Sequence, residues 1–171
     1  MGCDIHLVAE RKTADGWQVI PGPIVPCWLC SMNGRVTAEC YRCHGSGEFR
    51  DRWYSDRLYL VFAALADVRN YAASPRVDTQ SQPLTPIAAP RGLPADMSDE
   101  TRDLIEDDMD GHSDSWLTLD EVLAYDWDQP ITDDTEVWPL RDNARVFLER
   151  MEHLRQLTAG EDVRLVFNFD N

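Results

Sequence analysis

Two pairs of cysteines are the residues of this sequence whose type and spacing are best suited to chemistry. They lie in Cys27-Trp28-Leu29-Cys30 and in Cys40-Tyr41-Arg42-Cys43, two C-x2-C pairs with nine residues between them. Pairs of this kind supply four thiolates that can close tetrahedrally around zinc. Four thiolates leave no position for water, so we expect one structural Zn²⁺ ion per chain, bound by Cys27, Cys30, Cys40 and Cys43.

Disulfide bonds are the alternative use of these cysteines. They form mainly in secreted proteins, whereas the first residues, MGCDIHLVAERK, lack the basic start and the long apolar stretch of a secretion signal. No apolar run approaches the roughly 20 residues that cross a bilayer. We therefore favour zinc over disulfides and expect a cytoplasmic protein.

The second cysteine pair carries a family resemblance. It continues as Cys40-Tyr41-Arg42-Cys43-His44-Gly45-Ser46-Gly47, which resembles the C-x-x-C-x-G-x-G repeat of DnaJ-type zinc-finger modules, also found in anti-TRAP and other small regulatory proteins. The first pair departs from the repeat, because Met32 stands where a glycine is expected and only Gly34 is retained. The resemblance covers roughly residues 27–47. It implies zinc and a glycine-bent hairpin, but neither co-chaperone activity nor peptide binding.

A second set of polar residues could form a catalytic site. Asp4 and His6 are two positions apart in an alternating segment, so their side chains point to the same side of a strand, and a loop with His112 could converge on them. One carboxylate and two imidazoles could hold a hydrolytic metal with an open position, or act as a base and its orienting partner. An anionic substrate could then be bound by Arg69, Asn70 and Arg91.

These polar residues also have purely structural explanations. A strand histidine beside an aspartate is often a simple hydrogen-bonded pair, and a short His-Ser segment before a helix is often a cap. Arg69 follows a predicted helix, where the helix macrodipole favours a basic side chain. Both explanations stay open at this point.

The net charge of −15 is concentrated in one stretch. Residues 95–137 contain sixteen acidic side chains and one basic side chain, Arg102, and the acids and bases of the remaining chain cancel. Such a surface repels nucleic acid and attracts cations or basic proteins, although it could also serve solubility alone. We therefore expect a protein partner, with a basic one as the first candidate.

Nucleic-acid binding through the cysteine segment ranks lower. Four basic side chains and three aromatic side chains that could stack on bases lie in or near it: Arg35, Arg42, Arg50, Arg52, Trp28, Tyr41 and Trp53. Three acids nearly cancel those bases, namely Glu39, Glu48 and Asp51.

The elements that must position these residues indicate an α+β fold. Residues 3–10 alternate as a half-buried strand, residues 17–20 can return as its hairpin partner, and residues 163–169 alternate again. Helices are expected from Ser55 to about Val68, from Ser98, from about Leu119 to Tyr125 after a Thr118–Glu121 capping box, and from about Pro139 to Leu157. We expect the N- and C-terminal strands to share one small antiparallel sheet that packs on the helices.

The length and composition favour a single domain over residues 1–171, since 171 residues that are 43% hydrophobic can bury one core. Residues 24–53 are then an inserted zinc-knuckle subdomain. Residues 70–94 are rich in Pro, Ser, Ala and Gln and are expected to form a long loop.

Short motifs along the whole chain carry a second resemblance. They are the start MGCDIH, the segment LVFAALADVRN at 60–70, RGLP at 91–94 and HSDSWLT at 112–118. Together they resemble a family of small phage and bacterial proteins that begin with MGCDIH. The resemblance brings no established activity and implies a phage or prophage origin, which would place the protein in the host cytoplasm.

Two functions follow from the sequence. The first is a zinc-stabilised acidic interaction protein, phage-encoded, that engages a host macromolecule. The alternative is a hydrolase or nucleotide-processing enzyme with its site at Asp4, His6 and His112. No membrane contact and no particular oligomeric state are indicated.

Overall fold

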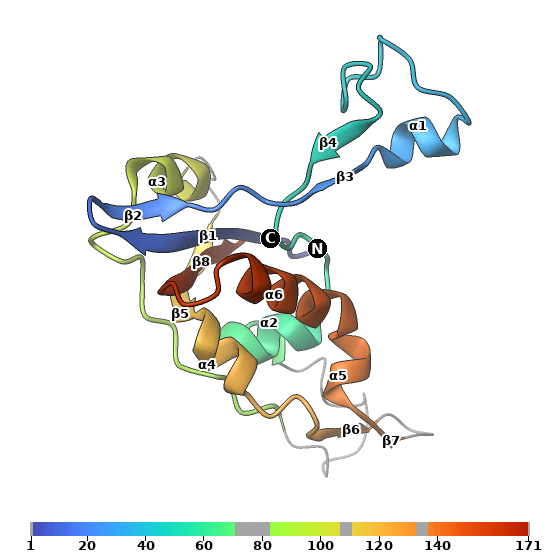
Figure 1. Cartoon of the computed structure of the whole chain (residues 1–171). Helices are drawn as coiled ribbons and strands as arrows, with labels where there is room; N and C mark the ends of the chain where they lie inside the picture. Colours follow the sequence, from blue (N-terminus) through green and yellow to red (C-terminus); the bar gives the residue numbers. More distant parts are fainter. Residues whose placement is uncertain (1, 71–82, 107–110, 133–136, 171) are drawn as a thin grey trace. The chain divides into compact units, whose positions relative to one another are not determined.

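The structure is a computed structural model, and it describes residues 2–70, 83–106, 111–132 and 137–170 (Figure 1). The chain divides into two compact units. The larger unit combines Met1–Ile20 with Tyr54–Asn171, and the smaller unit is Pro21–Trp53, which includes the predicted insertion at 24–53. The expected α+β fold, with a small antiparallel sheet and a cluster of four cysteines, is confirmed. Within the described part of the chain, no helix is long and apolar enough to cross a membrane.

A four-stranded antiparallel sheet organises the larger unit. Its strand order is β2-β1-β8-β5, formed by β1 (Ile5–Thr13), β2 (Gly16–Val19), β8 (Val163–Phe169) and β5 (His112–Thr118). The N-terminal hairpin therefore joins the last strand, as predicted. Strand β5 was expected to be a loop, because its sequence HSDSWLT lacks apolar alternation. The segment is a strand because it pairs with β8, although its own residues do not indicate one.

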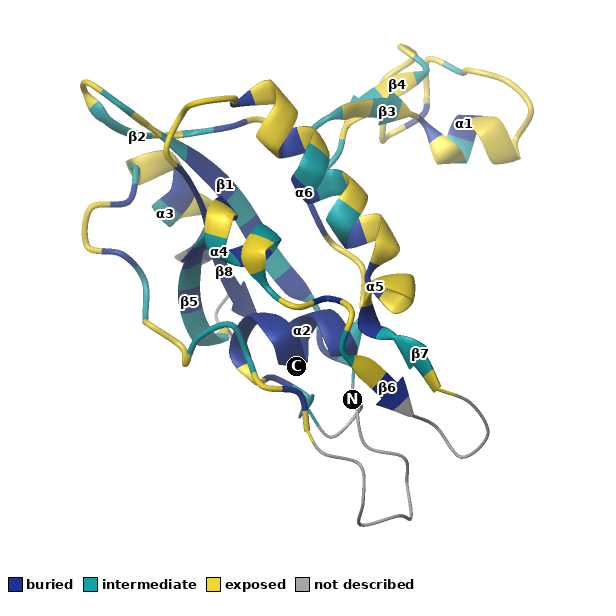
Figure 2. Cartoon of the chain, turned by 60° about the horizontal axis from the view of Figure 1, so that its bottom comes forward, coloured by how far each residue is buried: buried dark blue, intermediate teal, exposed yellow. Residues whose placement is uncertain are grey.

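Helices cover both faces of β8, and all seven of its residues are buried (Figure 2). On one face, α3 (Asp99–Glu106) contributes Ile105 to a small apolar cluster with Met97 and Val166. On the other face, Phe62 of α2 (Tyr59–Ala66) lies with its ring centroid 5.0 Å from that of Phe169. The core of the larger unit thus continues through the sheet.

Helix α2 is buried at every residue after Tyr59, as its apolar sequence predicts. Its start differs from the prediction, because the helix begins at Tyr59 after Leu58 and Ser55 does not cap it. The residues before the helix are held by a tertiary contact instead: the Arg57 guanidinium forms a two-point ion pair with the Asp4 carboxylate.

The remaining helices lie near their predicted positions. Helix α4 (Leu119–Ala124) begins with the predicted capping box, in which Thr118 Oγ1 accepts from the Glu121 N–H and Glu121 Oε2 accepts from the Thr118 N–H. The helix predicted at 139–157 is divided into α5 (Leu140–Asn143) and α6 (Arg145–Leu157). A two-stranded ribbon of β6 (Pro130–Thr132) and β7 (Val137–Pro139) precedes them.

Candidate metal centre

The smaller unit holds the four paired cysteines on a short scaffold. Strands β3 (Ile24–Pro26) and β4 (Glu48–Arg50) form an antiparallel ribbon that brings the two ends of the cysteine segment together. The Cys27 N–H donates a 2.8 Å hydrogen bond to the Gly47 carbonyl and so closes the base of the segment. Helix α1 (Trp28–Met32) follows at once and carries Cys30 on its buried side.

The four sulfur atoms converge on one point. Cys27 Sγ lies 3.7 Å from Cys40 Sγ, Cys30 Sγ lies 3.5 Å from Cys43 Sγ, and all four atoms lie within 4.8 Å of one another. Tetrahedral coordination with Zn–S bonds of about 2.3 Å places sulfur atoms roughly 3.8 Å apart. All four cysteines are buried and none of them forms a disulfide bond, so their thiols are grouped as potential metal ligands.

In the second cysteine knuckle, residues 40–47, two glycines allow the backbone to bend around the sulfur atoms. Gly45 has φ +86° and Gly47 has φ +80°, in the left-handed region that glycine enters without steric cost. A Cβ at Gly45 would also meet the Ala38 backbone at 3.0 Å. The first knuckle does not need a glycine at Met32, because Met32 ends helix α1 and the left-handed turn falls on Gly34, at φ +66°.

The four thiols perturb one another. Burial raises the pKa of Cys30, and the neighbouring thiols of Cys43, Cys40 and Cys27 add to this, so that its pKa reaches about 12 even though the Thr37 N–H opposes the shift. Burial also acts to raise the pKa of Cys43, but the Gly47 N–H and the adjacent thiols outweigh it and bring the pKa to about 6. Without a cation, the cluster therefore holds protons that a metal ion would displace.

Four buried sulfur ligands at tetrahedral spacing form a donor set for a metal ion. Tetrahedral sites with four sulfurs suit zinc or iron, and neither leaves a coordination position for substrate when all four ligands are protein thiolates. Among the described residues, this is the group of three or more potential ligands that comes within binding distance.

No protein-family model, no curated protein and no solved structure matches the chain. Two other candidate ligands lie outside the cluster. His44 is exposed and follows Cys43 in the turn, and Cys3 is buried in the larger unit, where burial raises its pKa.

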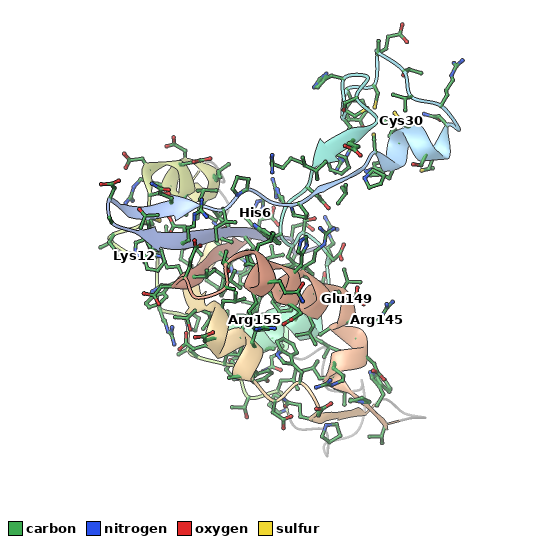
Figure 3. All side chains as sticks on the ribbon, in the orientation of Figure 1. His6, Lys12, Cys30, Arg145, Glu149 and Arg155 are labelled. Carbon is green, nitrogen blue, oxygen red and sulfur yellow. The ribbon has the colours of Figure 1, made fainter. Side chains whose placement is uncertain are left out.

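Asp4 immediately precedes β1 and His6 lies on β1. The two side chains point to the same side of the chain, as predicted, because Ile5 between them is buried on the other side. His6 Nε2 lies 3.2 Å from Asp170 Oδ2 (His6 is labelled in Figure 3), and Asp170 Oδ1 accepts a hydrogen bond from the Asp4 N–H. These contacts form a hydrogen-bonded pair at the end of the sheet.

The structure does not bring His112 to Asp4 and His6. His112 pairs with Phe169 in the sheet and stacks on its ring at 6.2 Å, whereas His6 pairs with Asn168. Neighbouring residues of a strand point to opposite faces, so the two histidines lie on opposite faces of the sheet. The three-residue catalytic site is therefore not assembled.

The three predicted substrate-binding residues have separate structural contacts. The Asn70 side chain bonds to both the N–H and the carbonyl of Leu84 and so fastens the chain beyond α2. Arg91 donates two hydrogen bonds to the Glu121 carboxylate, which lowers the pKa of Glu121 to about 2, with burial acting against the shift. Arg69 lies over the Tyr59 ring. They do not form one anion site.

Sequence reasoning missed a buried polar network on the α3 face of the sheet. Glu10 and Arg164 are paired across β1 and β8, and Arg164 Nη1 also bonds to Asp96. The signal was present, since an acid and a base occupy the same face of two strands predicted to share a sheet. The pairing depends on the register between β1 and β8, which the residues of either strand alone do not specify.

Proposed function

We propose that this protein is a zinc-stabilised interaction protein that engages a macromolecular partner. The observation that carries the proposal is the convergence of four buried cysteines in a unit too small to hold its shape through an apolar core. Only Leu29 and Phe49 pack against the cysteines among the described apolar residues of that cluster. Zinc would therefore supply the stability of the unit and leave its surface for contact.

The surface of the smaller unit supports this role. Met32 is 77% exposed and Tyr41 is 70% exposed, and Trp28 and Val36 are exposed as well. Trp28 and Met32 are four residues apart on α1, so they lie on the same side of that helix. Large apolar side chains that a folded unit leaves in water are typical of contact surfaces.

The acidic segment contributes less free charge than its composition indicates. Asp96 is paired with Arg164, Glu121 with Arg91, and Asp128 with Arg141. Asp99, Glu100 and Asp103 of α3 are exposed, while Asp107, Asp108, Asp110, Asp133, Asp134 and Glu136 lie outside the described residues. A basic partner would therefore meet the α3 region first. A phage origin and a host partner, which rest on the sequence resemblance, remain part of the proposal.

The knuckle surface is tested with Trp28→Ala/Tyr41→Ala. Wild type and variant are loaded with zinc, checked for equal metal content, and used to capture proteins from a host-cell extract with quantitative mass spectrometry. Proteins retained by the wild type should be lost by the variant, because the exposed aromatic side chains supply most of the contact energy. Identical capture by both proteins would place the interface elsewhere.

The acidic segment is tested by the salt dependence of the same capture. Exposed charges are screened beyond about 8 Å at physiological ionic strength, so a contact through α3 weakens as salt rises. Asp99→Lys/Asp103→Lys should weaken it further without unfolding the protein. Nuclease treatment of the extract separates direct protein capture from a nucleic-acid bridge. Loss of all capture after nuclease would favour the nucleic-acid interpretation, in which Arg42, which now lies over the Phe49 ring, would take part.

A further inference from the structure

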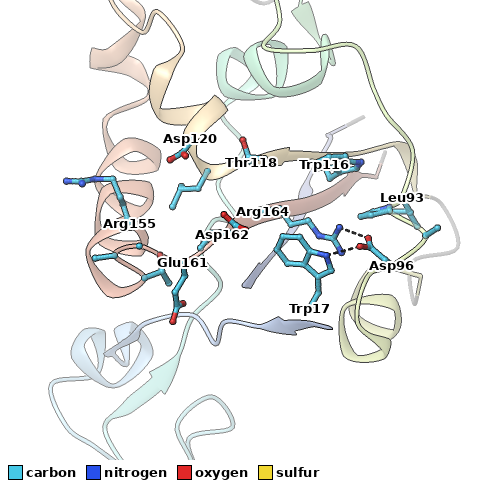
Figure 4. Close-up of a pocket in the computed structure, with 17 residues that line it drawn as sticks. Trp17, Leu93, Asp96, Trp116, Thr118, Asp120, Arg155, Glu161, Asp162 and Arg164 are labelled. Atoms are coloured by element: carbon cyan, nitrogen blue, oxygen red, sulfur yellow. Dashed lines mark hydrogen bonds and ion pairs between the residues drawn. The ribbon is translucent and has the colours of Figure 1, made fainter. Parts of the chain in front are cut away.

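A large open cavity lies on the α3 face of the sheet in the larger unit. Its volume is about 1050 Å³, and its walls come from the hairpin, from the loop before α3, from the start of α4 and from the turn between α6 and β8 (Figure 4). This is the size range of sites that enclose a small ligand or a few residues of a peptide. None of the predicted metal, catalytic or substrate-binding residues lines it, whereas Asp96 and Asp120 belong to the acidic stretch predicted to meet a partner.

The two ends of the cavity differ in chemistry. Asp120, Glu161 and Asp162 lie on the side of α6, and Trp17, Trp116 and Leu93 lie on the other side (Figure 4). Two bases lie at the acidic end: Arg155 is already bound by both carboxylate oxygens of Glu152, and Arg11 Nη1 lies 3.6 Å from Glu161 Oε2. Among the described residues, Asp120 and Asp162 form no ion pair. The acidic end therefore keeps a negative potential that favours a cation and repels an anion.

Arg164 lines the cavity between these two ends. Its side chain is 4% exposed, its Nε bonds to Glu10 and its Nη1 bonds to Asp96. Its Nη2 is buried and has no hydrogen-bond partner among the described residues. A buried donor without an acceptor is unfavourable, so a ligand that brings an acceptor oxygen to Nη2 would gain binding energy there.

The charges around Arg164 indicate which acceptor fits. Glu10 and Asp96 carry two negative charges, and Arg164 and Lys12 carry two positive charges, with Lys12 Nζ 3.8 Å from Asp96 Oδ2. The group is neutral as it stands. A neutral amide carbonyl is therefore a better acceptor for Arg164 Nη2 than an anionic group, which would add negative charge to a protein of net charge −15.

We propose that the cavity binds a basic side chain of a polypeptide, an arginine or a lysine. The cationic end lies between Asp120 and Asp162, the backbone carbonyl accepts from Arg164 Nη2, and the peptide backbone continues past Arg164 over Trp116 and Leu93. Asp162 and Arg164 are two residues apart in extended chain, about 6.6 Å, a length that an extended basic side chain spans. The inference extends the proposed interaction role but uses the larger unit alone.

Trp17 must move when this ligand enters. Its ring lies 3.9 Å over the Arg164 guanidinium, its Nε1 donates to Asp96, and it helps to cover Nη2. Trp17 stands on the short edge strand β2 and is only half-buried, so a shift of its ring disturbs little of the core. Binding should therefore change the tryptophan fluorescence, and Trp17→Phe should reduce that change to the part that comes from Trp116.

The test uses the full zinc-loaded chain and three probes in fluorescence and calorimetric titrations. They are acetyl-Gly-Arg-Gly-amide, the same peptide with citrulline in place of arginine, and free arginine. Citrulline keeps the shape of arginine without its charge. We expect the arginine peptide to bind about tenfold or more tightly than the citrulline peptide, and free arginine to bind more weakly because its carboxylate is repelled.

Matched variants decide whether the carboxylates of the cavity are responsible. Asp120→Asn/Asp162→Asn should weaken binding of the arginine peptide about tenfold, whereas Asp56→Asn/Asp142→Asn, the same change of charge at exposed positions outside the cavity, should have little effect. Trp28→Ala/Tyr41→Ala should bind the peptide as the wild type does, even if the knuckle has no partner. Equal weakening by both aspartate pairs, equal binding of the citrulline peptide, or no binding at millimolar peptide would each overturn the proposal.

Discussion

Arg164 on β8 and Glu10 on β1 face each other across the sheet and form a buried ion pair, in which Arg164 Nε donates a 2.8 Å hydrogen bond to Glu10 Oε2. The other oxygen of Glu10 accepts from the Ser98 N–H and from the Thr101 hydroxyl at the start of α3. The pair therefore fastens α3 to the two central strands. A buried charge that loses its partner is strongly destabilising, so this network is a sensitive point of the fold.

Replacing Glu10 by alanine should destabilise the protein by about 3–5 kcal/mol, because Arg164 would be left buried with only the exposed Asp96 as its counter-ion. Urea unfolding monitored by circular dichroism gives the value. The control is Glu149→Ala, which removes an exposed ion pair with Arg145 and should change the stability by about 0.5 kcal/mol or less. Equal small effects in both variants would show that the Glu10 pair contributes nothing beyond a surface contact.

The same carboxylate should make stability depend on pH. Burial acts to raise the pKa of Glu10, but the hydrogen bonds from Thr101, Ser98 and Arg164 outweigh it, and the pKa lies below the ordinary value of 4.5. A lowered folded-state pKa contributes stability that is fully present above pH 4.5 and is lost as the pH falls through the folded value. Asp96 and Glu121 act in the same direction.

Unfolding free energies measured from pH 6 to pH 3 should therefore decrease below pH 4.5, and Glu10→Gln should flatten that decrease. The glutamine variant keeps the shape of the side chain and cannot titrate. A wild-type profile that stays level between pH 4.5 and pH 3 would contradict the assigned direction of these pKa shifts.

The sequence indicates local structure well where one residue pattern decides it. The capping box at Thr118 and Glu121, the alternation of β1 and the two C-x2-C knuckles depend on neighbours within a few positions. Strand β5 and the double-sided burial of β8 depend on partners more than 40 residues away, so their own residues carry little signal. Arg164 and Asn168 look like a solvent face until α3 is placed over them.

The catalytic interpretation was limited by the same kind of information. Alternation showed that Asp4 and His6 share one side of a strand, but the pairing of His112 with Phe169 sets the face on which His112 lies. That register is a property of two strands together. The cysteine cluster needed no such knowledge, because two short knuckles determine most of its geometry.

Cys40→Ser should remove the metal ion and destabilise the smaller unit. Elemental analysis should find about one zinc ion per wild-type chain, because four thiolates complete one tetrahedral shell. Cys3→Ala serves as the control, since Cys3 is buried in the larger unit and should leave the zinc content unchanged. A metal-free wild type that is as stable as the loaded protein would end the structural role of the ion.

The second knuckle should tolerate a methyl group less well than the first. Both Gly34 and Gly45 have positive φ, so alanine costs about 1–2 kcal/mol in backbone strain at either position. At Gly45 the new Cβ also meets the Ala38 backbone at 3.0 Å, whereas at Gly34 it meets nothing within 4 Å. Gly45→Ala should therefore lower zinc affinity more than Gly34→Ala in a competition with a chromogenic chelator. Equal effects at the two positions would mean that backbone strain alone governs both turns and that the contact with Ala38 adds nothing.

His6 and His112 should respond differently to substitution. His6 Nε2 bonds to Asp170, so His6→Ala should destabilise the protein by about 1 kcal/mol through the loss of that hydrogen bond. His112 stacks on Phe169, and its Nε2 is buried with no partner in the described part of the chain. His112→Phe keeps the ring contact and removes both the unsatisfied nitrogen and the 3.0 Å hydrogen bond between Nδ1 and Ser113 Oγ, so the two effects oppose each other and the net change should be close to zero. Thermal unfolding of both variants, with their metal content measured in parallel, checks this. Unchanged zinc in both supports structural roles on separate faces of the sheet. A second metal in the wild type that either variant loses would instead restore the catalytic interpretation, because only a ligand role explains such a loss.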